Sequence, residues 1–158
     1  MRFKALVAAT ALTAVTAAGT AFANPEEMEA LTREMVLEAE TYFNETPLDD
    51  VKAAFNDPAS DRWVGDQYHL HMYGMDAEGV VWADSAFPDL VGMNSIDMAD
   101  FDGEFYNQDV LAGTEGHSDP YTVNIRFSNP ESGAIVDTVG TCLRPVQEHV
   151  ICAWANDS

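Results

Sequence analysis

Positive charge is scarce in this sequence: 7 lysines and arginines stand against 27 aspartates and glutamates, and the formal net charge at pH 7 is −20. Such an excess of negative charge repels the phosphates of nucleic acids and the anionic surface of a membrane, and it favours solubility. We therefore expect this acidic protein to have no nucleic-acid partner and, once an N-terminal leader is removed, no membrane contact.

Sequence motifs for catalysis are also missing. None of the serines lies in a Gly-x-Ser-x-Gly setting, and the carboxylates form no pattern that stands out from the general acidity. We predict that the protein is not an enzyme and that it uses no cofactor.

Cysteine is limited to Cys142 and Cys152. Two strand-like segments, residues 134–143 and 148–154, flank a turn, and a hairpin centred near Gln147 would place the two cysteines opposite one another. In an exported protein this arrangement favours a disulfide between them. The spacing excludes a catalytic CxxC motif.

Long apolar runs are absent beyond the N-terminal segment. Residues 1–4 are basic, residues 5–18 are apolar, and residues 21–23 read Ala-Phe-Ala, a site of the kind that signal peptidase cleaves. We expect residues 1–23 to be a removed signal peptide and the protein to be periplasmic or secreted. An uncleaved anchor is the alternative, but the run is shorter than the roughly 20 apolar residues that span a bilayer. The remainder, residues 24–158, suffices for one domain.

Two helices are expected after the leader. Asn24 is a good N-cap, Pro25 suits the first helical position and Glu27 is placed to complete a capping box. Apolar residues then recur at steps of three and four, which predicts an amphipathic helix of about five turns. They are Met28, Leu31, Met35, Ala39 and Tyr42. A second, shorter helix should lie between Pro47 and Phe55.

Strand-like patterns fill much of the rest. The apolar, aromatic-rich residues 67–75 and 80–83 flank an Asp/Gly turn and predict a hairpin. The proline- and glycine-marked residues 87–92 should then return over one face of the sheet and cover the functional site. Residues 95–112 suggest short helical turns, and residues 121–127 alternate as a half-buried strand does. Helices at one end of the chain and hairpin-linked strands predict an α+β fold.

Six short segments, in this order along the chain, resemble those of a single Cache domain, the extracytoplasmic sensor module of bacterial chemoreceptors and kinases. They are Phe55-Asn56-Asp57, Asp66-Gln67-Tyr68, the turn at 76–79 with its following strand, Leu90-Val91-Gly92-Met93-Asn94, Asp100-Phe101-Asp102-Gly103 and Asn129-Pro130-Glu131-Ser132-Gly133. The resemblance covers nearly all of residues 24–158. It implies a PAS-like fold, in which a curved antiparallel sheet carries a long N-terminal helix on one face and a pocket for small ligands, often carboxylates, on the other.

The sequence departs from the family pattern at two positions of the implied pocket. Asp84 stands where a histidine tends to follow the second strand, and Thr138 stands where a lysine tends to follow the Asn-Pro-x-x-Gly turn. Arg126 is the alternative cation for a ligand carboxylate, unless it forms a surface salt bridge of little energy. Because no signalling helix follows Trp154, we expect a free-standing module that binds a small molecule and whose bound state a protein partner reads.

The candidate ligand contacts combine the polar and aromatic residues of these segments. His69 and His71 lie two apart on the expected strand and should share a face, and an aromatic residue can either wall a pocket or belong to the core. The candidates are Tyr68, His69, His71, Trp82, Asp84, Tyr106, Tyr121, Arg126 and Thr138.

A periplasmic copper-binding protein is the alternative function. His69, His71, Met72 and Met75 supply imidazole and thioether groups, which suit copper. Strand alternation argues against this reading, because Met72 should face away from both histidines. If copper is not bound, the two histidines belong to the pocket or the surface and the two methionines belong to the core.

Overall fold

The computed structural model describes residues 24–128 and 132–157. The expected leader at residues 1–23 and the start of the turn at 129–133 lie outside the described residues. The elements, in chain order, are α1 (Pro25–Glu45), α2 (Leu48–Phe55), β1 (His71–Asp76), β2 (Val81–Asp84), a 3-10 turn η1 (Pro88–Leu90), α3 (Tyr106–Thr114), β3 (Tyr121–Ser128), β4 (Ile135–Val146) and β5 (His149–Asn156).

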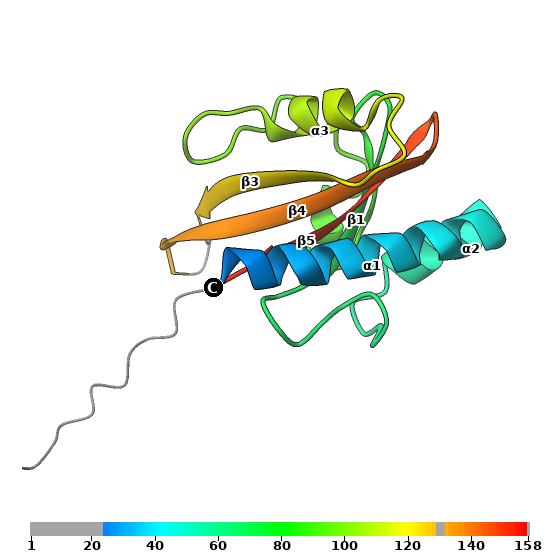
Figure 1. Ribbon diagram of the computed structural model, residues 1–158, viewed down its shortest axis with the longest axis horizontal. Helices are drawn as coiled ribbons and strands as arrows, with labels where there is room; N and C mark the ends of the chain where they lie inside the picture. The colour runs from blue at the N-terminus through cyan, green and yellow to red at the C-terminus, as the bar shows by residue number, and fades with distance from the viewer. Residues whose placement is uncertain (1–23, 129–131, 158) are drawn as a thin grey trace, which may run out of the picture.

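The five strands form one antiparallel sheet in the order β2-β1-β5-β4-β3. Figure 1 shows α1 lying along one face of the sheet and α3 over the other. This arrangement confirms the predicted α+β, PAS-like class, with a long N-terminal helix packed on one face.

The start of α1 follows from its capping residues. The side chain of Asn24 accepts a hydrogen bond from the backbone N–H of Glu26 at 3.2 Å, and Pro25 occupies the first turn. The buried stripe of the helix runs through Met28, Thr32, Val36 and Ala39. Met28 and Ala39 were expected in this stripe, whereas Thr32 and Val36 were not. The other expected residues, Leu31, Met35 and Tyr42, are partly buried beside it.

Thr32 is accommodated in the core by a hydroxyl pair. Its Oγ1 lies 2.7 Å from Oγ1 of Thr141 on β4, and it also donates to the carbonyl oxygen of Glu29. Both threonines are fully buried. Hydrogen bonding makes this burial of polar groups tolerable.

The first expected strand is shorter than its sequence suggests. We expected it over residues 67–75, but β1 begins at His71. The backbone φ angles of Tyr68 and His69 are 56° and 45°, in the left-handed region, where an extended strand cannot continue. Leu70 N–H donates instead to the carbonyl of Gln67, which closes a turn.

The helix near the middle of the chain is longer than expected and lies further along. Short turns were predicted over 95–112, whereas a continuous helix, α3, runs from Tyr106 to Thr114. Its buried residues are Asn107, Val110 and Thr114. Two of these three are polar, so the apolar periodicity of the sequence is weak here.

The two cysteines behave as predicted. Cys142 on β4 and Cys152 on β5 are direct cross-strand partners, and they form a disulfide with a Cα–Cα distance of 4.1 Å. Both are fully buried on the α3 side of the sheet. Within the described residues, no helix combines the length and the apolar character that crossing a membrane requires.

Candidate ligand-binding cavity

A cavity of about 660 Å³ lies on the sheet face remote from α1. This volume falls within the range of small-molecule sites, about 300–1,000 Å³. Its floor is made of side chains that pair across neighbouring strands. Ile125, Thr138 and Asn156 form one row across β3, β4 and β5, and His71 of β1 lies opposite Trp154 of β5.

The segment after β2 roofs the cavity, as the sequence predicted for its proline- and glycine-marked loop. We call residues 85–92 the roof loop. Asp84 anchors it at the start, because Oδ1 accepts the backbone N–H groups of Ala86 at 2.9 Å and Phe87 at 2.7 Å. At its end, Gly92 N–H donates to the carbonyl oxygen of Val81 at 2.8 Å, which returns the chain to β2.

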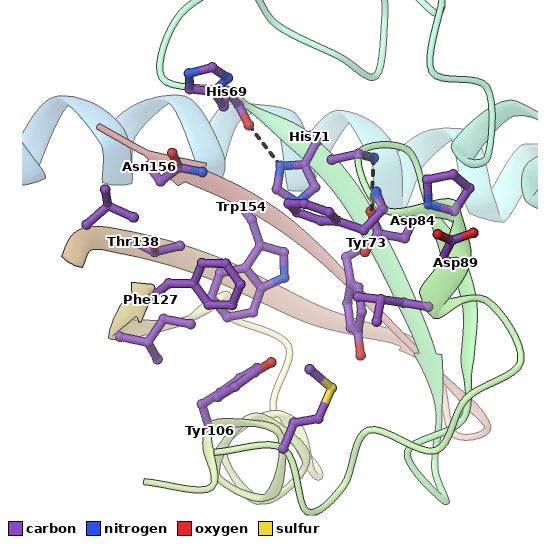
Figure 2. A pocket seen from close by; sticks show the side chains of 17 residues that line it. His69, His71, Tyr73, Asp84, Asp89, Tyr106, Phe127, Thr138, Trp154 and Asn156 are labelled. Atoms are coloured by element: carbon purple, nitrogen blue, oxygen red, sulfur yellow. Dashed lines mark hydrogen bonds between the residues drawn. The ribbon is translucent and has the colours of Figure 1, made fainter. Parts of the chain in front are cut away.

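Aromatic rings wall the cavity (Figure 2). The Trp154 ring lies edge-on to Tyr106, with centroids 5.8 Å apart, and to Tyr73, at 6.5 Å. Phe87 of the roof loop meets His71 in the same way, at 5.8 Å. These perpendicular contacts are a favoured geometry for aromatic pairs, so the walls support one another.

Glycine at position 140 makes room for the tryptophan wall. A Cβ atom at Gly140 would stand 2.4 Å from the Trp154 ring, which is closer than any real contact. The indole therefore lies directly against the backbone of β4. This close approach sets the position of the cavity floor.

His71 and Asp84 are buried polar neighbours at the cavity edge. Nδ1 of His71 donates its hydrogen to the carbonyl oxygen of His69 at 2.8 Å, which leaves Nε2 as an acceptor in the neutral ring. Burial lowers the pKa of His71, against the opposing effect of Asp84. Burial raises the pKa of Asp84, and His71 with the two roof-loop N–H groups oppose that rise.

The tyrosines of the walls are held in the neutral form. Burial raises the pKa of Tyr106 to about 12, and the negative charges of Asp84 and Asp100 add to the rise. Burial also raises the pKa of Tyr73, whose hydroxyl lies 2.8 Å from Oγ of Ser95. Both hydroxyls therefore keep their protons near neutral pH.

Thr138 contributes a hydroxyl that the described residues leave without a hydrogen-bond partner. The residue lines the cavity and is only 8% exposed. A buried polar atom without a partner costs free energy, and buried hydroxyls in folded proteins nearly always have one. This oxygen is a candidate contact for a bound molecule.

The structure brings five of the nine sequence candidates to this cavity: His69, His71, Asp84, Tyr106 and Thr138. His69 reaches it although it precedes the strand on which it was expected. These five come from four separate stretches of the chain, so only folding brings them together.

Two of the other four candidates lie on the α1 side of the sheet. The hydroxyl of Tyr68 donates to the carboxylate of Glu27 on α1 at 2.9 Å. The Trp82 ring stacks against Phe55 of α2, with centroids 6.1 Å apart. Both side chains pack against the core between the sheet and the helices, and neither is among the residues that line the cavity.

The last two candidates lie on β3. The ring of Tyr121 fills the space beside Gly113 of α3, where a Cβ would come within 2.6 Å of it. Arg126 is on the surface, where its guanidinium pairs with the carboxylate of Asp102 and lies over the Phe101 ring. Neither residue lines the cavity.

Several lining residues were not among the candidates. Ile125 and Phe127 follow from the alternation that the sequence shows for this strand, and Trp154 and Asn156 share a face with Cys152 on β5. Extending the same alternation into the last strand would have found them. The roof-loop residues were covered by the predicted loop but not singled out.

The four residues of the copper alternative do not converge on one point. His69 and His71 line the cavity, whereas Met72 is fully buried between the sheet and α1. Met75 is fully buried in the core beneath α3. Across residues 24–128 and 132–157, no three histidine, cysteine, aspartate or glutamate side chains gather as metal ligands do.

Neither the models of known protein families nor the curated proteins include a match to this sequence, but solved structures match its fold. A methyl-accepting chemotaxis protein from Vibrio parahaemolyticus RIMD 2210633 aligns with a TM-score of 0.64 at 12% identity, over 82% of this chain and 88% of that one. A periplasmic sensor domain of a chemotaxis protein gives 0.60 at 15% identity, over 85% and 95%. A Cache chemosensory domain described for carboxylic acid recognition gives 0.59 at 13% identity, over 84% and 92%. The chain therefore shares the fold of these domains, as its resemblance to the Cache family implied.

Proposed function

We propose that this protein is an exported, sensor-type domain that binds a small molecule in the cavity opposite α1. The observation that carries the proposal is Thr138, a residue of the cavity lining whose buried hydroxyl has no hydrogen-bond partner among the described residues. Cavities of this size with a few polar groups among aromatic walls are typical ligand sites. The sensor domains that share the fold support the same reading.

The bound state would be reported to a protein partner through the roof loop. Phe87, Val91 and Met93 in and beside this loop are 40–52% exposed, and exposed apolar side chains that gather on one segment are a feature of protein interaction sites. A ligand that contacts the inner side of the loop would alter how its outer side is displayed. The domain itself would bind and present the ligand without changing it chemically.

Co-purified small molecules provide the most direct test. The protein would be isolated without prolonged dialysis, denatured, and its extract examined by mass spectrometry. Ala86→Trp would place a large ring at the cavity, and Ala59→Trp would place the same ring at an exposed position away from it. We expect a bound molecule in the wild type and in Ala59→Trp, and its loss in Ala86→Trp.

A second measurement covers ligands that escape during purification. A panel of small acids, amines and purines would be screened for a rise in melting temperature, since a ligand that binds only the folded state stabilises it. Absence of both a co-purified molecule and any thermal shift would refute the binding function. Recovery of the periplasmic form beginning at Asn24 would test the expected export.

A further inference from the structure

The cavity lining contains acidic side chains that no lysine or arginine of the lining balances. Two carboxylates, Asp84 and Asp89, belong to its lining, and none of the residues that line it is a lysine or an arginine. Asp84 is 2% exposed, whereas Asp89 lies on the exposed roof loop. Buried charges are normally paired, and no lysine or arginine of the lining pairs with either carboxylate, which leaves room for a cationic ligand group.

Burial raises the pKa of Asp84, the backbone around it opposes that rise, and a cation bound beside it would oppose the rise further. Two N–H groups, from Ala86 and Phe87, point at Oδ1 and stabilise a carboxylate better than a carboxylic acid. Its neighbour His71 does not bring a reliable positive charge. The ring donates its Nδ1 hydrogen to a carbonyl oxygen, and its burial favours the neutral form.

The other surfaces of the cavity also present electron-rich atoms. Nε2 of neutral His71 is an acceptor, and the faces of the Trp154, Tyr106 and Phe87 rings carry the negative side of an aromatic quadrupole. Carboxylates and ring faces together are the surroundings that proteins use to hold organic cations.

The basic side chains that could have paired with a ligand carboxylate are not at the cavity. Arg126 is paired with Asp102 on the surface, and position 138 has a threonine. A ligand carboxylate in this cavity would meet Asp84 and Asp89, and the lining offers it no lysine or arginine. Like charges at short distance disfavour such a ligand.

We propose that the cavity selects an organic cation, a protonated amine or a quaternary ammonium, with its charge near Asp84 and its carbon atoms against the rings of Trp154, Tyr106 and Phe87. The inference rests on the proposed binding function and narrows its ligand class. It separates this chain from the Cache domain of the same fold that is described for carboxylic acid recognition.

Ligand series that differ only in charge test the proposal. The first series is choline, its uncharged isostere dimethylbutanol, in which a tert-butyl group replaces the trimethylammonium, and the anion dimethylbutyrate. The second is propylamine, propanol and propionate. Binding to the mature protein would be measured by calorimetry and thermal shift. We expect the cation of at least one series to bind about tenfold or more tightly than its neutral and anionic partners, and the two series distinguish a quaternary from a primary ammonium.

Charge-removing variants locate the effect. Asp84→Asn keeps an oxygen for the two roof-loop N–H groups and should reduce the preference for the cation about tenfold. Asp89→Asn, at an exposed position that tolerates substitution, should reduce it in the same direction. Glu34→Gln removes the same charge from the solvent face of α1 and should leave the preference unchanged.

The possible outcomes distinguish a failure of the cation inference from a failure of the proposed binding function. If the acid or the alcohol of a series binds more tightly than the cation, the cation inference is overturned and the binding function still holds. A co-purified anion would have the same consequence. Cation binding that survives both Asp84→Asn and Asp89→Asn would also overturn it. If neither series binds and the protein carries no molecule from the cell, the binding function falls as well.

Discussion

Substitution of Thr138 by valine should stabilise the ligand-free protein. The hydroxyl is buried at the cavity floor and has no hydrogen-bond partner among the described residues. In the unfolded chain the same hydroxyl is hydrated, so folding loses that hydration without a replacement. Valine has nearly the same shape and carries no polar atom, and it is at least as favourable as threonine in a strand.

The magnitude follows from the cost of an unsatisfied buried group, about 1–3 kcal/mol. Because Thr138 lines a cavity into which its side chain can adjust, we take the lower half of that range, about 1–2 kcal/mol. For a domain of this size, each kcal/mol corresponds to roughly 3–5 °C in melting temperature. The same substitution should weaken ligand binding, since a contact for the bound molecule is removed.

Thr141→Val on the same strand is the matched control. The Thr141 hydroxyl is equally buried but is bonded to Thr32 at 2.7 Å. Its removal should destabilise the protein by about 1 kcal/mol. Urea denaturation and differential scanning calorimetry of the two variants, with protein freed of small molecules, would compare substitutions of identical chemistry and opposite expected sign.

A Thr138→Val variant that is destabilised as much as Thr141→Val would contradict this prediction. That result would mean that the hydroxyl has a partner in the folded protein, and it would remove the observation on which the proposed binding function depends.

Three further perturbations have definite expected results. Gly140→Ala should cost about 1–3 kcal/mol in urea denaturation, because its Cβ would overlap the Trp154 ring; an unchanged midpoint would show that the ring moves freely. Replacing both Cys142 and Cys152 by alanine should lower the free energy of unfolding by about 2.5–3 kcal/mol, the loop-closure entropy for a separation of 10 residues, and a loss below about 1 kcal/mol would contradict it. Tyr106, with a pKa of about 12 against an ordinary 10, ionises first in the unfolded chain. Stability should therefore fall between pH 10 and pH 12, by up to roughly 2.7 kcal/mol, and Tyr106→Phe should flatten this slope.

The fold was accessible from the sequence because its main signals are local. The cap at Asn24, the alternation along β3 and the spacing of the cysteines each predict an element that the structure contains. Strand and helix ends were less accessible. The left-handed backbone at Tyr68 and His69 is imposed by the surrounding fold, and neither residue type predicts that conformation.

The composition of the site was only partly accessible, because a cavity is defined by residues far apart in the chain. Alternation placed Ile125 and Phe127 on one face, but no sequence pattern shows which face is covered. The position of Arg126 depends on Asp102, which lies in a segment without periodicity. Trp82 was expected at the pocket because it is aromatic, and it instead packs against Phe55 on the helix side.

One carboxylate, that of Asp84, both anchors the segment above the cavity and contributes to the cavity wall. Any molecule that draws on this side chain competes or cooperates with the backbone amides it restrains. Ligand binding in the cavity and the conformation of the outer surface of the roof loop are then thermodynamically linked, and the linkage is reciprocal. A partner protein that prefers one conformation of the outer surface would change the affinity for the small molecule by the same factor as the small molecule changes the affinity for the partner.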